Sequence, residues 1–438
     1  MEVPGADSRP AGLADNTGSQ SGIRVEAGRR ARLVEGSRNV DQVENPHLPR
    51  VLLVHNRYQE RAGEDLSFDA DRRVLAENGV EITEYVRDNR EIEGAGPFEK
   101  LRMVVGTSWA AGAKAEIREL LKEWRPDVVH FHNTFPLISP APYWACRAAG
   151  VPVVQTLRNF RIFCAPGILF RDGHICHDCV GKLPQWPGVL HACYRGSRSQ
   201  TVPVTAMQTF HGLAGTWTKL VDAYIAASPF MRSKLIELGL PSEKIHVRAD
   251  VVEGVSPGNR HAAFALFVGR LTVEKGVRTL LDAWSTVVGM HLKLVGTGPL
   301  ETEVRERVSS SDLHGRVEVL GPLPSDQTIA LIREAAVVVV PSESYETFGR
   351  VPLEAAGCGV PTIASRLGAL TDTVQHGVTG LLFSPGVAAD LAAAACWVRD
   401  HPDEMVEMGS KAREQYELHY SPSSTFERLM EIYGLVCR

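Results

Sequence analysis

Two cationic side chains stand on one short segment of the chain, where they could hold a negatively charged ligand. Arg270 and Lys275 follow the apolar run FALFVG, and a helical pattern begins directly after Gly276. Both cations are therefore expected on a loop at the carboxyl end of a strand. Cations in that position suit the charge that develops on a diphosphate leaving group. Because cations on loops are common, a pair of ordinary surface residues is the alternative.

A second segment, with the sequence PSESYETFGRVPLEAAG, combines a predicted anion site with acidic residues. A predicted strand leads into a loop that holds Glu346, and a helix is expected to open at Val351 or Pro352. The free N–H groups of the first helical turn form a ready anion site. Gly349, just before that turn, would let a ligand approach the backbone closely.

Glu346 and Glu354 are expected to bind hydroxyl groups, because a carboxylate beside phosphates would repel them. Glu354 lies one turn inside the predicted helix, whose apolar neighbours indicate burial, and a buried glutamate needs polar partners. Amides that bind an anion next to carboxylates that bind hydroxyls fit a nucleotide sugar. The alternative makes Glu354 an ordinary helix residue and Glu346 a loop acid. The predicted donor-binding residues of this segment are Phe348, Gly349, Arg350 and Glu354.

Four motifs together carry a resemblance to a known family. They are E-x7-E from Glu346 to Glu354, G-R-L-x3-K-G at 269–276, G-T-G at 296–298 and V-P-x-I-A-S-x-x-G at 360–368. This set resembles the family 4 (group 1) retaining glycosyltransferases of the GT-B fold. The resemblance runs from about Arg50 to the C-terminus and is densest in the C-terminal half.

The resemblance implies an enzyme, a hexosyltransferase-type transferase with a UDP- or GDP-sugar as donor. Arg270 and Lys275 would hold the diphosphate, while Glu346 would contact the donor sugar. Glu354 would contact the ribose of the nucleotide. The acceptor hydroxyl would attack on the face that the diphosphate leaves, so the anomeric configuration would be retained, and catalysis would need no metal or other cofactor. The predicted catalytic residues are Glu346, Arg270 and Lys275, and Gly296 and Gly298 join the donor-binding set.

The loop after the apolar run at 51–54 is a candidate acceptor contact. Members of the family often carry a glycine-rich loop here that ends in glutamate. This chain keeps Gly63 and Glu64 but has Ala62 where a second glycine is common. The backbone of the loop therefore has less conformational freedom, and Gly63 and Glu64 remain the predicted acceptor-binding residues.

Three further acceptor-side candidates follow the next two predicted strands. His130 and His132 share one face at a strand end; we expect His130 to be buried and hydrogen-bonded, and His132 and Asn133 to lie nearer the acceptor. Family members often have a histidine close to the donor sugar where this chain has Arg158. Since arginine cannot act as a base near neutral pH, Arg158 is expected to bind an anion, such as a charged group of the acceptor.

Four cysteines form the pattern C-x11-C-x2-C-x13-C within a stretch of low apolar content. They are Cys164, Cys176, Cys179 and Cys193. Four thiolates at such spacing suit a closed, tetrahedral, structural zinc site, which could staple a long insertion. An iron–sulfur cluster, disulfides and free thiols are the alternatives. The other four cysteines are expected to be ordinary buried or tail residues.

Two series of apolar strands and amphipathic helices must position these residues. Such alternation predicts the α/β class, with two Rossmann-like, doubly wound parallel sheets that face each other across a cleft. The predicted parts are a disordered leader (1–49), an acceptor-side domain (50–247) with a cysteine-rich insertion at about 160–200, a linker near 248–260, a nucleotide-sugar-binding domain (261–415) and a C-terminal helix (416–438) that could pack back on the first domain.

Charge and hydropathy narrow the possible partners. The net charge of -5 argues against a general nucleic-acid binder. No apolar run approaches the ~20 residues that cross a bilayer, and the N-terminus does not read as a secretory signal, so we expect a cytoplasmic protein. Residues 141–235 carry ten basic and three acidic side chains, a balance of +7. This balance indicates an anionic acceptor, a peripheral contact with the inner membrane face, or merely a solvated surface.

Two other functions fit the same architecture. One is a nucleotide-sugar 2-epimerase, against which the E-x7-E element speaks. The other is a non-catalytic partner-binding protein, which the intact cations and glutamates disfavour. Our preferred prediction is transfer to a glycan or lipid-linked acceptor in envelope or exopolysaccharide synthesis.

Overall fold

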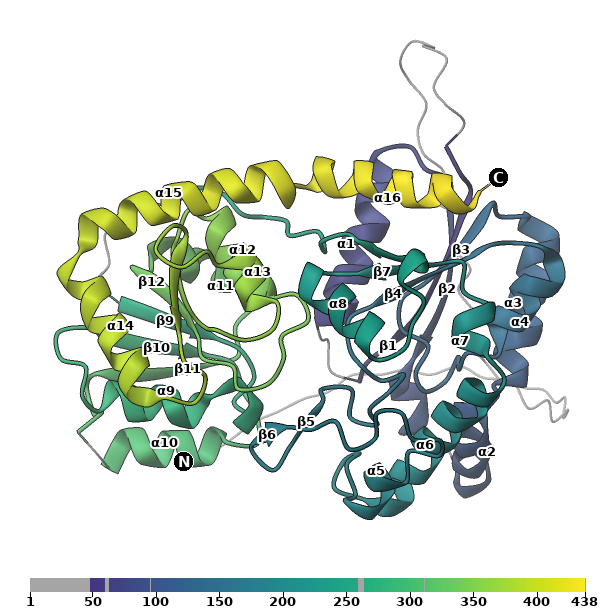
Figure 1. Cartoon of the computed structure of the whole chain (residues 1–438), viewed down its shortest axis with the longest axis horizontal. Coiled ribbons are helices and arrows are strands. Elements are labelled where there is room, and N and C mark those ends of the chain that lie inside the picture. The colour runs from purple at the N-terminus through teal and green to yellow at the C-terminus, as the bar shows by residue number, and fades with distance from the viewer. Residues whose placement is uncertain (1–47, 60–62, 95, 259–263, 311, 438) are drawn as a thin grey trace, which may run out of the picture.

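The computed structural model describes residues 48–59, 63–94, 96–258, 264–310 and 312–437, arranged as two α/β halves (Figure 1). Nearly all of the predicted leader therefore lies outside the described residues, as do residues 259 and 260 of the predicted linker. Within the described parts of the chain, no helix has both the length and the apolar character needed to cross a bilayer.

The N-terminal half is built on a six-stranded parallel sheet in the order β2-β1-β3-β4-β7-β8. Residues 51–54 of β1 are fully buried, as expected for a parallel sheet whose two faces are both covered. The strands are β1 (Val51–Arg57), β2 (Ile82–Asp88), β3 (Val128–Phe131), β4 (Val153–Leu157), β7 (Ala223–Ala226) and β8 (Ile245–Val247). The helices around it include α1 (Gly63–Glu77), α2 (Pro97–Ser108), α3 (Ala111–Trp124), α4 (Pro142–Ala149) and α8 (Pro229–Glu237).

The C-terminal half repeats the design with the order β11-β10-β9-β12-β13-β14, again all parallel. The prediction of two doubly wound sheets is thus confirmed. The strands are β9 (Phe264–Val268), β10 (His291–Val295), β11 (Val317–Gly321), β12 (Val337–Val340), β13 (Thr362–Ser365) and β14 (Gly380–Phe383). The helices are α9 (Val277–Trp284), α10 (Glu301–Ser310), α11 (Ser325–Glu334), α12 (Arg350–Gly357), α13 (Leu370–Thr373) and α14 (Ala388–Asp400).

In each sheet the strand order reverses at one point, and open α/β sheets bind ligands in the crevice beyond the strand ends at such points. The reversal lies between β1 and β3 in the first sheet and between β9 and β12 in the second. The predicted acceptor loops follow β1 and β3, and the predicted donor loops follow β9 and β12. The topology therefore gathers the candidate residues at the two places where a ligand is expected.

Two long helices, α15 (Pro402–His419) and α16 (Pro422–Val436), run across both halves (Figure 1). Helix α15 packs on the C-terminal half, whereas Leu429, Ile432 and Tyr433 of α16 pack against the core of the N-terminal half. The segment after β8 crosses in the other direction beside them. Arg248 Nε donates to the Thr425 carbonyl at 3.0 Å, and the Tyr416 hydroxyl donates to the Val252 carbonyl at 2.7 Å. The two crossings are thus bonded to each other.

An insertion between β4 and β7 carries the four patterned cysteines. It holds a small antiparallel hairpin of β5 (Phe170–Arg171) and β6 (His174–Ile175), followed by α5 (Trp186–Leu190), α6 (Arg198–Leu213) and α7 (Thr216–Lys219). Figure 1 shows the hairpin at the junction of the two halves. The insertion therefore has little regular structure of its own before α5.

Candidate active site

Lys275 and Glu346 meet at the strand-order reversal of the second sheet. The Lys275 ammonium donates to Glu346 Oε1 at 2.5 Å, and the Ser342 hydroxyl donates to the same oxygen at 2.5 Å. The contact arises because β9 and β12 are neighbours, so the loops after them lie side by side. Two of the three predicted catalytic residues are therefore brought together.

The backbones of these two loops are held against each other. Gly276 has φ +67°, and a Cβ built there would lie 1.9 Å from the Pro341 carbonyl oxygen. The Glu343 N–H also donates to the Glu274 carbonyl at 2.9 Å. A residue with a side chain would need both a left-handed backbone and a displaced neighbour at position 276. Glycine therefore permits the approach that places Lys275 beside Glu346.

The Glu346 carboxylate is kept ionised by its neighbours. Burial opposes its negative charge, but the charge and hydrogen bond of Lys275 and the hydroxyl of Ser342 outweigh that effect and lower the pKa of Glu346. An ionised carboxylate accepts hydrogen bonds only. Glu346 is therefore suited to receive hydroxyl groups, as the sequence predicts.

Arg270 remains open to solvent. Its side chain is 67% exposed and makes an ion pair with Glu274 at 3.1 Å. Exposed pairs of this kind are worth at most about 1 kcal/mol, so the guanidinium can leave it for a ligand at little cost. Arg270 is thus brought near the other donor residues without being fixed in place.

Gly296 and Gly298 pack against the backbone of the Arg270 loop. A Cβ at Gly296 would lie 1.9 Å from the Gly269 carbonyl oxygen, and one at Gly298 would lie 2.5 Å from that of Leu271. The Leu271 N–H donates to the Thr297 carbonyl at 2.9 Å. These glycines thus shape the loop that carries Arg270, while direct contact with a donor stays a prediction.

Helix α12 begins at Arg350, one or two residues earlier than predicted. Gly349 precedes it as the N-cap with φ +79°, and no side chain caps the first turn, which follows the loop after β12. Phe348 packs into an apolar cluster with Leu353 and Tyr416. Because its side chain packs in this cluster, Phe348 could contact a donor only through its backbone.

Glu354 is buried and paired with Arg350 in the same helix. Arg350 Nε donates to Glu354 Oε1 at 2.8 Å. Burial raises the pKa of Glu354, although the Arg350 charge acts in the opposite direction. This pair supplies the partner that a buried glutamate requires, and it also occupies the guanidinium that the sequence assigns to the donor.

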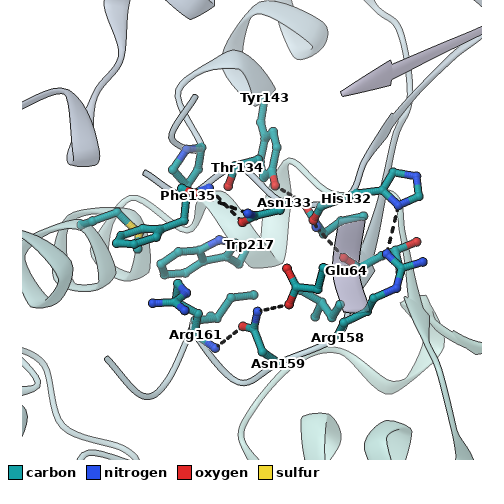
Figure 2. A pocket seen from close by; sticks show the side chains of 16 residues that line it. Glu64, His132, Asn133, Thr134, Phe135, Tyr143, Arg158, Asn159, Arg161 and Trp217 are labelled. Atoms are coloured by element: carbon teal, nitrogen blue, oxygen red, sulfur yellow. Dashed lines mark hydrogen bonds between the residues drawn. The ribbon is translucent and has the colours of Figure 1, made fainter. Parts of the chain in front are cut away.

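A pocket in the N-terminal half lies at the other strand-order reversal (Figure 2). Glu64 lines it, and both of its carboxylate oxygens accept hydrogen bonds, from Asn159 Nδ2 at 2.6 Å and the Tyr58 hydroxyl at 2.9 Å. Gly63 is the first residue of α1, so the helix aims Glu64 into the pocket. Asn159, which sequence analysis missed, also accepts from the Arg161 N–H at 2.8 Å.

Asn133 and His132 form another wall of this pocket. Asn133 Nδ2 donates to the Asn56 carbonyl at 2.7 Å, so its amide fixes the turn after β3. His132 Nδ1 accepts from Arg158 Nη1 at 3.0 Å, because a guanidinium only donates. His132 Nε2 is buried and has no hydrogen-bond partner within the described residues. Burial, followed by the nearby charges, holds the pKa of His132 well below its usual value.

His130 is buried and hydrogen-bonded on both ring nitrogens, which confirms the prediction. Nδ1 lies 2.7 Å from the Tyr433 hydroxyl and Nε2 lies 2.6 Å from Thr156 Oγ1. Burial lowers the pKa of His130 strongly, with the Arg248 charge as a smaller cause. This histidine therefore joins α16 to the first sheet and does not face the pocket lining.

Arg158 lies in the pocket wall but is already paired. It makes ion pairs with Asp250 at 2.8 Å and Asp71 at 3.3 Å, and all three side chains are buried. Its carbonyl accepts from Thr347 Oγ1 at 2.8 Å. Thr347 follows Glu346, so this bond joins the two halves beside the donor loop. Anion binding by Arg158 stays a prediction, and it would have to compete with both carboxylates.

The four patterned cysteines line one small cavity. All eight cysteines of the chain are free thiols. Burial raises the pKa of the Cys164, Cys179 and Cys193 thiols, that of Cys179 to about 11, and neighbouring cysteine sulfurs add to each shift. Over the described ranges, no three His, Cys, Asp or Glu side chains stand close enough together to hold a metal ion.

Comparisons with known proteins find relatives for both halves of the chain. Residues 50–250 match the family described as "Glycosyl transferase 4-like domain", and residues 263–401 match "Glycosyl transferases group 1". A D-inositol 3-phosphate glycosyltransferase of Pseudarthrobacter chlorophenolicus is 36% identical over 39% of this chain and 41% of its own length. A glycogen synthase of Mycobacterium tuberculosis is 25% identical over 81% of this chain and 80% of its own length.

Solved structures show the same fold. HepE of Anabaena, determined in complex with UDP-glucose, has a TM-score of 0.62 at 17% identity and covers 88% of this chain and 100% of its own. Sucrose-phosphate synthase of Thermosynechococcus elongatus has a TM-score of 0.64 at 19% identity and covers 88% of this chain and 98% of its own. At these identities the likeness establishes the two-domain architecture alone.

Proposed function

The chain belongs to the group 1 glycosyltransferases of the GT-B fold, and from this membership we propose that it transfers a sugar, with retention of configuration, from a UDP- or GDP-sugar to a glycan or lipid-linked acceptor. The observation that carries the proposal is the bonded pair of Lys275 and Glu346 at the strand-order reversal. The cation there could bind the diphosphate of a nucleotide sugar, and the ionised carboxylate could bind the hydroxyl groups of the sugar.

Each donor residue then has a distinct role. Lys275, Arg270 and the first-turn amides of α12 would neutralise the diphosphate as it leaves. Glu346 would accept hydroxyl groups of the sugar, and Glu354 those of the ribose. In the transfer, the bond from the anomeric carbon to the phosphate oxygen breaks and one to the acceptor oxygen forms on the same face. The leaving phosphate oxygen takes the acceptor proton, so no further reagent is needed.

The acceptor would enter the pocket that Glu64, Asn159 and His132 line in the N-terminal half. The Glu64 carboxylate could exchange one of its internal hydrogen bonds for an acceptor hydroxyl. The amide of Asn159, which also lines the pocket and bonds to Glu64 at 2.6 Å, offers a second polar contact. Such a pocket suits a hydroxylated substrate, as expected for a glycan intermediate of envelope or exopolysaccharide synthesis.

A lipid-linked acceptor would lie at a membrane, and one surface of the insertion has the chemistry to meet it. The exposed apolar side chains of the insertion include Leu183, Trp186, Leu190, Phe210 and Leu213, and these five are called here the apolar face. Helices α5 and α6 pack together, and Leu183 lies against Gly212 next to Leu213.

The basic residues around the apolar face are exposed, and between positions 179 and 221 the sequence has no acidic residue. Lys182 lies over the Trp186 ring at 5.4 Å. Exposed tryptophan and leucine among cations favour the interface of an anionic bilayer. We therefore infer peripheral binding to such a surface from the cytoplasmic side.

The first test is a thermal-shift panel of the full chain with UDP, GDP, ADP and CMP, each near saturation. A nucleotide at 100 times its Kd adds about 2.7 kcal/mol of stability, which appears as a rise of a few degrees. A shift with UDP or GDP supports the donor site, and retention is then read from the anomeric signal of the product. Donor turnover without acceptor would favour an epimerase, whereas no shift with any nucleotide would favour a non-catalytic binder.

A further inference from the structure

The cavity lined by Cys164, Cys176, Cys179 and Cys193 is small and enclosed by the insertion itself. Its volume is about 20 Å³, which is room for one occupant of the size of a water molecule. A single metal ion fits that space, and among the side chains that line the cavity only the four cysteines can bind a metal.

The backbone already bends around these cysteines. The Gly167 N–H donates to the Cys164 carbonyl at 2.9 Å, and the Val180 N–H donates to the His177 carbonyl at 2.9 Å. The Cys176 N–H donates to the Leu169 carbonyl at 2.8 Å. These turns bend the chain at Cys164, Cys176 and Cys179, which line a common space with Cys193 although they come from segments on both sides of the β5–β6 hairpin.

The geometry points to a structural Zn²⁺ ion held by the thiolates of Cys164, Cys176, Cys179 and Cys193. Binding exchanges four thiol protons for four Zn–S bonds of about 2.3 Å, with no change of oxidation state. Since the described side chains do not yet stand at ligand positions, the sulfurs must close inward on the ion. Few regular elements support this part of the insertion, so the ion supplies a link that its packing lacks.

The ion would also position a contact between the two halves of the molecule. His177 lies between Cys176 and Cys179, and its ring stacks on Tyr345 with the centroids 6.2 Å apart. Tyr345 precedes Glu346 in the donor loop, so the cysteine site braces the residue that is proposed to bind the sugar. This second role, unlike the metal site, rests on the proposed function.

Metal analysis of the full chain, purified under reducing conditions, tests the site directly. About one zinc per chain is expected in the wild type, and Cys176→Ser and Cys179→Ser should lose most of it. Cys396→Ser is the matched control, because Cys396 is half-buried on α14, far along the chain from the cavity. Equal zinc in all three variants would overturn the assignment.

A second measurement keeps the test valid if a serine variant fails to fold. Wild-type protein exchanged with Co²⁺ should show the visible absorption of a tetrahedral tetrathiolate complex. Iron with acid-labile sulfide, a disulfide among these cysteines, or four freely titrating thiols without metal would each contradict the proposal. All of these readouts are independent of sugar transfer.

The contact role is tested with His177→Ala. We expect the variant to keep its zinc and to bind UDP about threefold to tenfold more weakly, although the sequence of the donor loop is unchanged. If the variant keeps both its zinc and the UDP affinity of the wild type, the bracing role of His177 is contradicted, whereas the metal site is still supported. Zinc without UDP binding even in the wild type would instead contradict the proposed function.

Discussion

The Lys275 ammonium and the Glu346 carboxylate share one hydrogen bond of 2.5 Å, although their loops leave two different strands. Lys275 thereby lowers the pKa of Glu346, and each side chain holds the other in position before any donor arrives. A donor must enter between a preset cation and a preset anion. This order favours a ligand that carries a phosphate and hydroxyl groups a few atoms apart.

Replacing either member of this pair should damage catalysis more than stability. Lys275→Ala and Glu346→Ala are each expected to lower turnover about 10²–10³-fold, as for the loss of one group that stabilises a transition-state charge. Thermal unfolding should show both variants folded, since backbone bonds hold the loops. Arg278→Ala removes a nearby exposed cation paired with Glu303 and serves as the control. Near-normal turnover in both variants would remove the donor-site assignment.

Gly276→Ala should disturb the donor site through its backbone. The added Cβ would overlap the Pro341 carbonyl, so we expect a loss of about 1–3 kcal/mol of unfolding free energy and weaker UDP binding. Gly377→Ala is a matched control, because Gly377 has a similar positive φ but no atom within 4 Å of the new Cβ. If the two variants lose equal stability and keep equal UDP affinity, the close approach has no role.

Arg158→Met separates a structural role from an acceptor-binding role. It leaves Asp250 buried without its ion-pair partner, whereas Asp71 keeps an ion pair with Arg248 at 2.7 Å, so urea denaturation should show a loss of about 3 kcal/mol. A residue that only bound acceptor would change the KM for acceptor and not the unfolding free energy. Unchanged stability would therefore favour the anion-binding role that the sequence suggests.

Stability should fall in mildly acidic solution because of three buried histidines. Burial lowers the pKa of His55, His130 and His132 in the folded chain, so below about pH 6.5 the unfolded chain binds more protons. The stability that the neutral, buried histidines contribute is therefore complete above that pH and is lost as the pH falls toward their pKa values in the folded chain. Each histidine gives a slope of up to about 1.4 kcal/mol per pH unit. Urea titrations at pH 7.5 and 5.5 measure it, and His130→Gln should reduce the slope.

Vesicle binding tests the apolar face of the insertion. Leu213 is 75% exposed, and Leu213→Ser should weaken co-sedimentation with phosphatidylglycerol vesicles about tenfold, since a buried leucine is worth about 1.5–3 kcal/mol. Leu418→Ser is the control, because Leu418 is 64% exposed on α15 instead. Binding that is absent in the wild type, or equally weakened by both variants, would contradict the inferred membrane contact.

The sequence predicts the central strands and the donor loops because their signals are local. FALFVG corresponds to β9, and the spacing of Glu346 and Glu354 holds within one loop and helix. It does not predict β2 or β8, the first sheet's edge strands, because β2 mixes apolar with charged residues and β8 has only three residues. Inner strands of a parallel sheet are buried on both faces and can be recognised from continuous apolar runs, which edge strands lack.

The partners of Arg158 could not be predicted for a different reason. Asp71 and Asp250 lie 87 and 92 positions away in the chain. No local pattern connects them, and only folding places both carboxylates beside one guanidinium. The hydrogen bond from Thr347 to the Arg158 carbonyl spans 189 positions and is equally invisible to spacing.

The chain passes between its two halves twice, after β8 and between α15 and α16, and the two passages are bonded at Arg248–Thr425 and Tyr416–Val252. Both passages run near the top edge of the molecule in Figure 1. Elsewhere the donor loop itself joins the halves, because Thr347 donates to the Arg158 carbonyl, the Ser228 hydroxyl donates to the Thr347 carbonyl, and Tyr345 stacks on His177. Any displacement of one half against the other is therefore transmitted directly to the neighbours of Glu346.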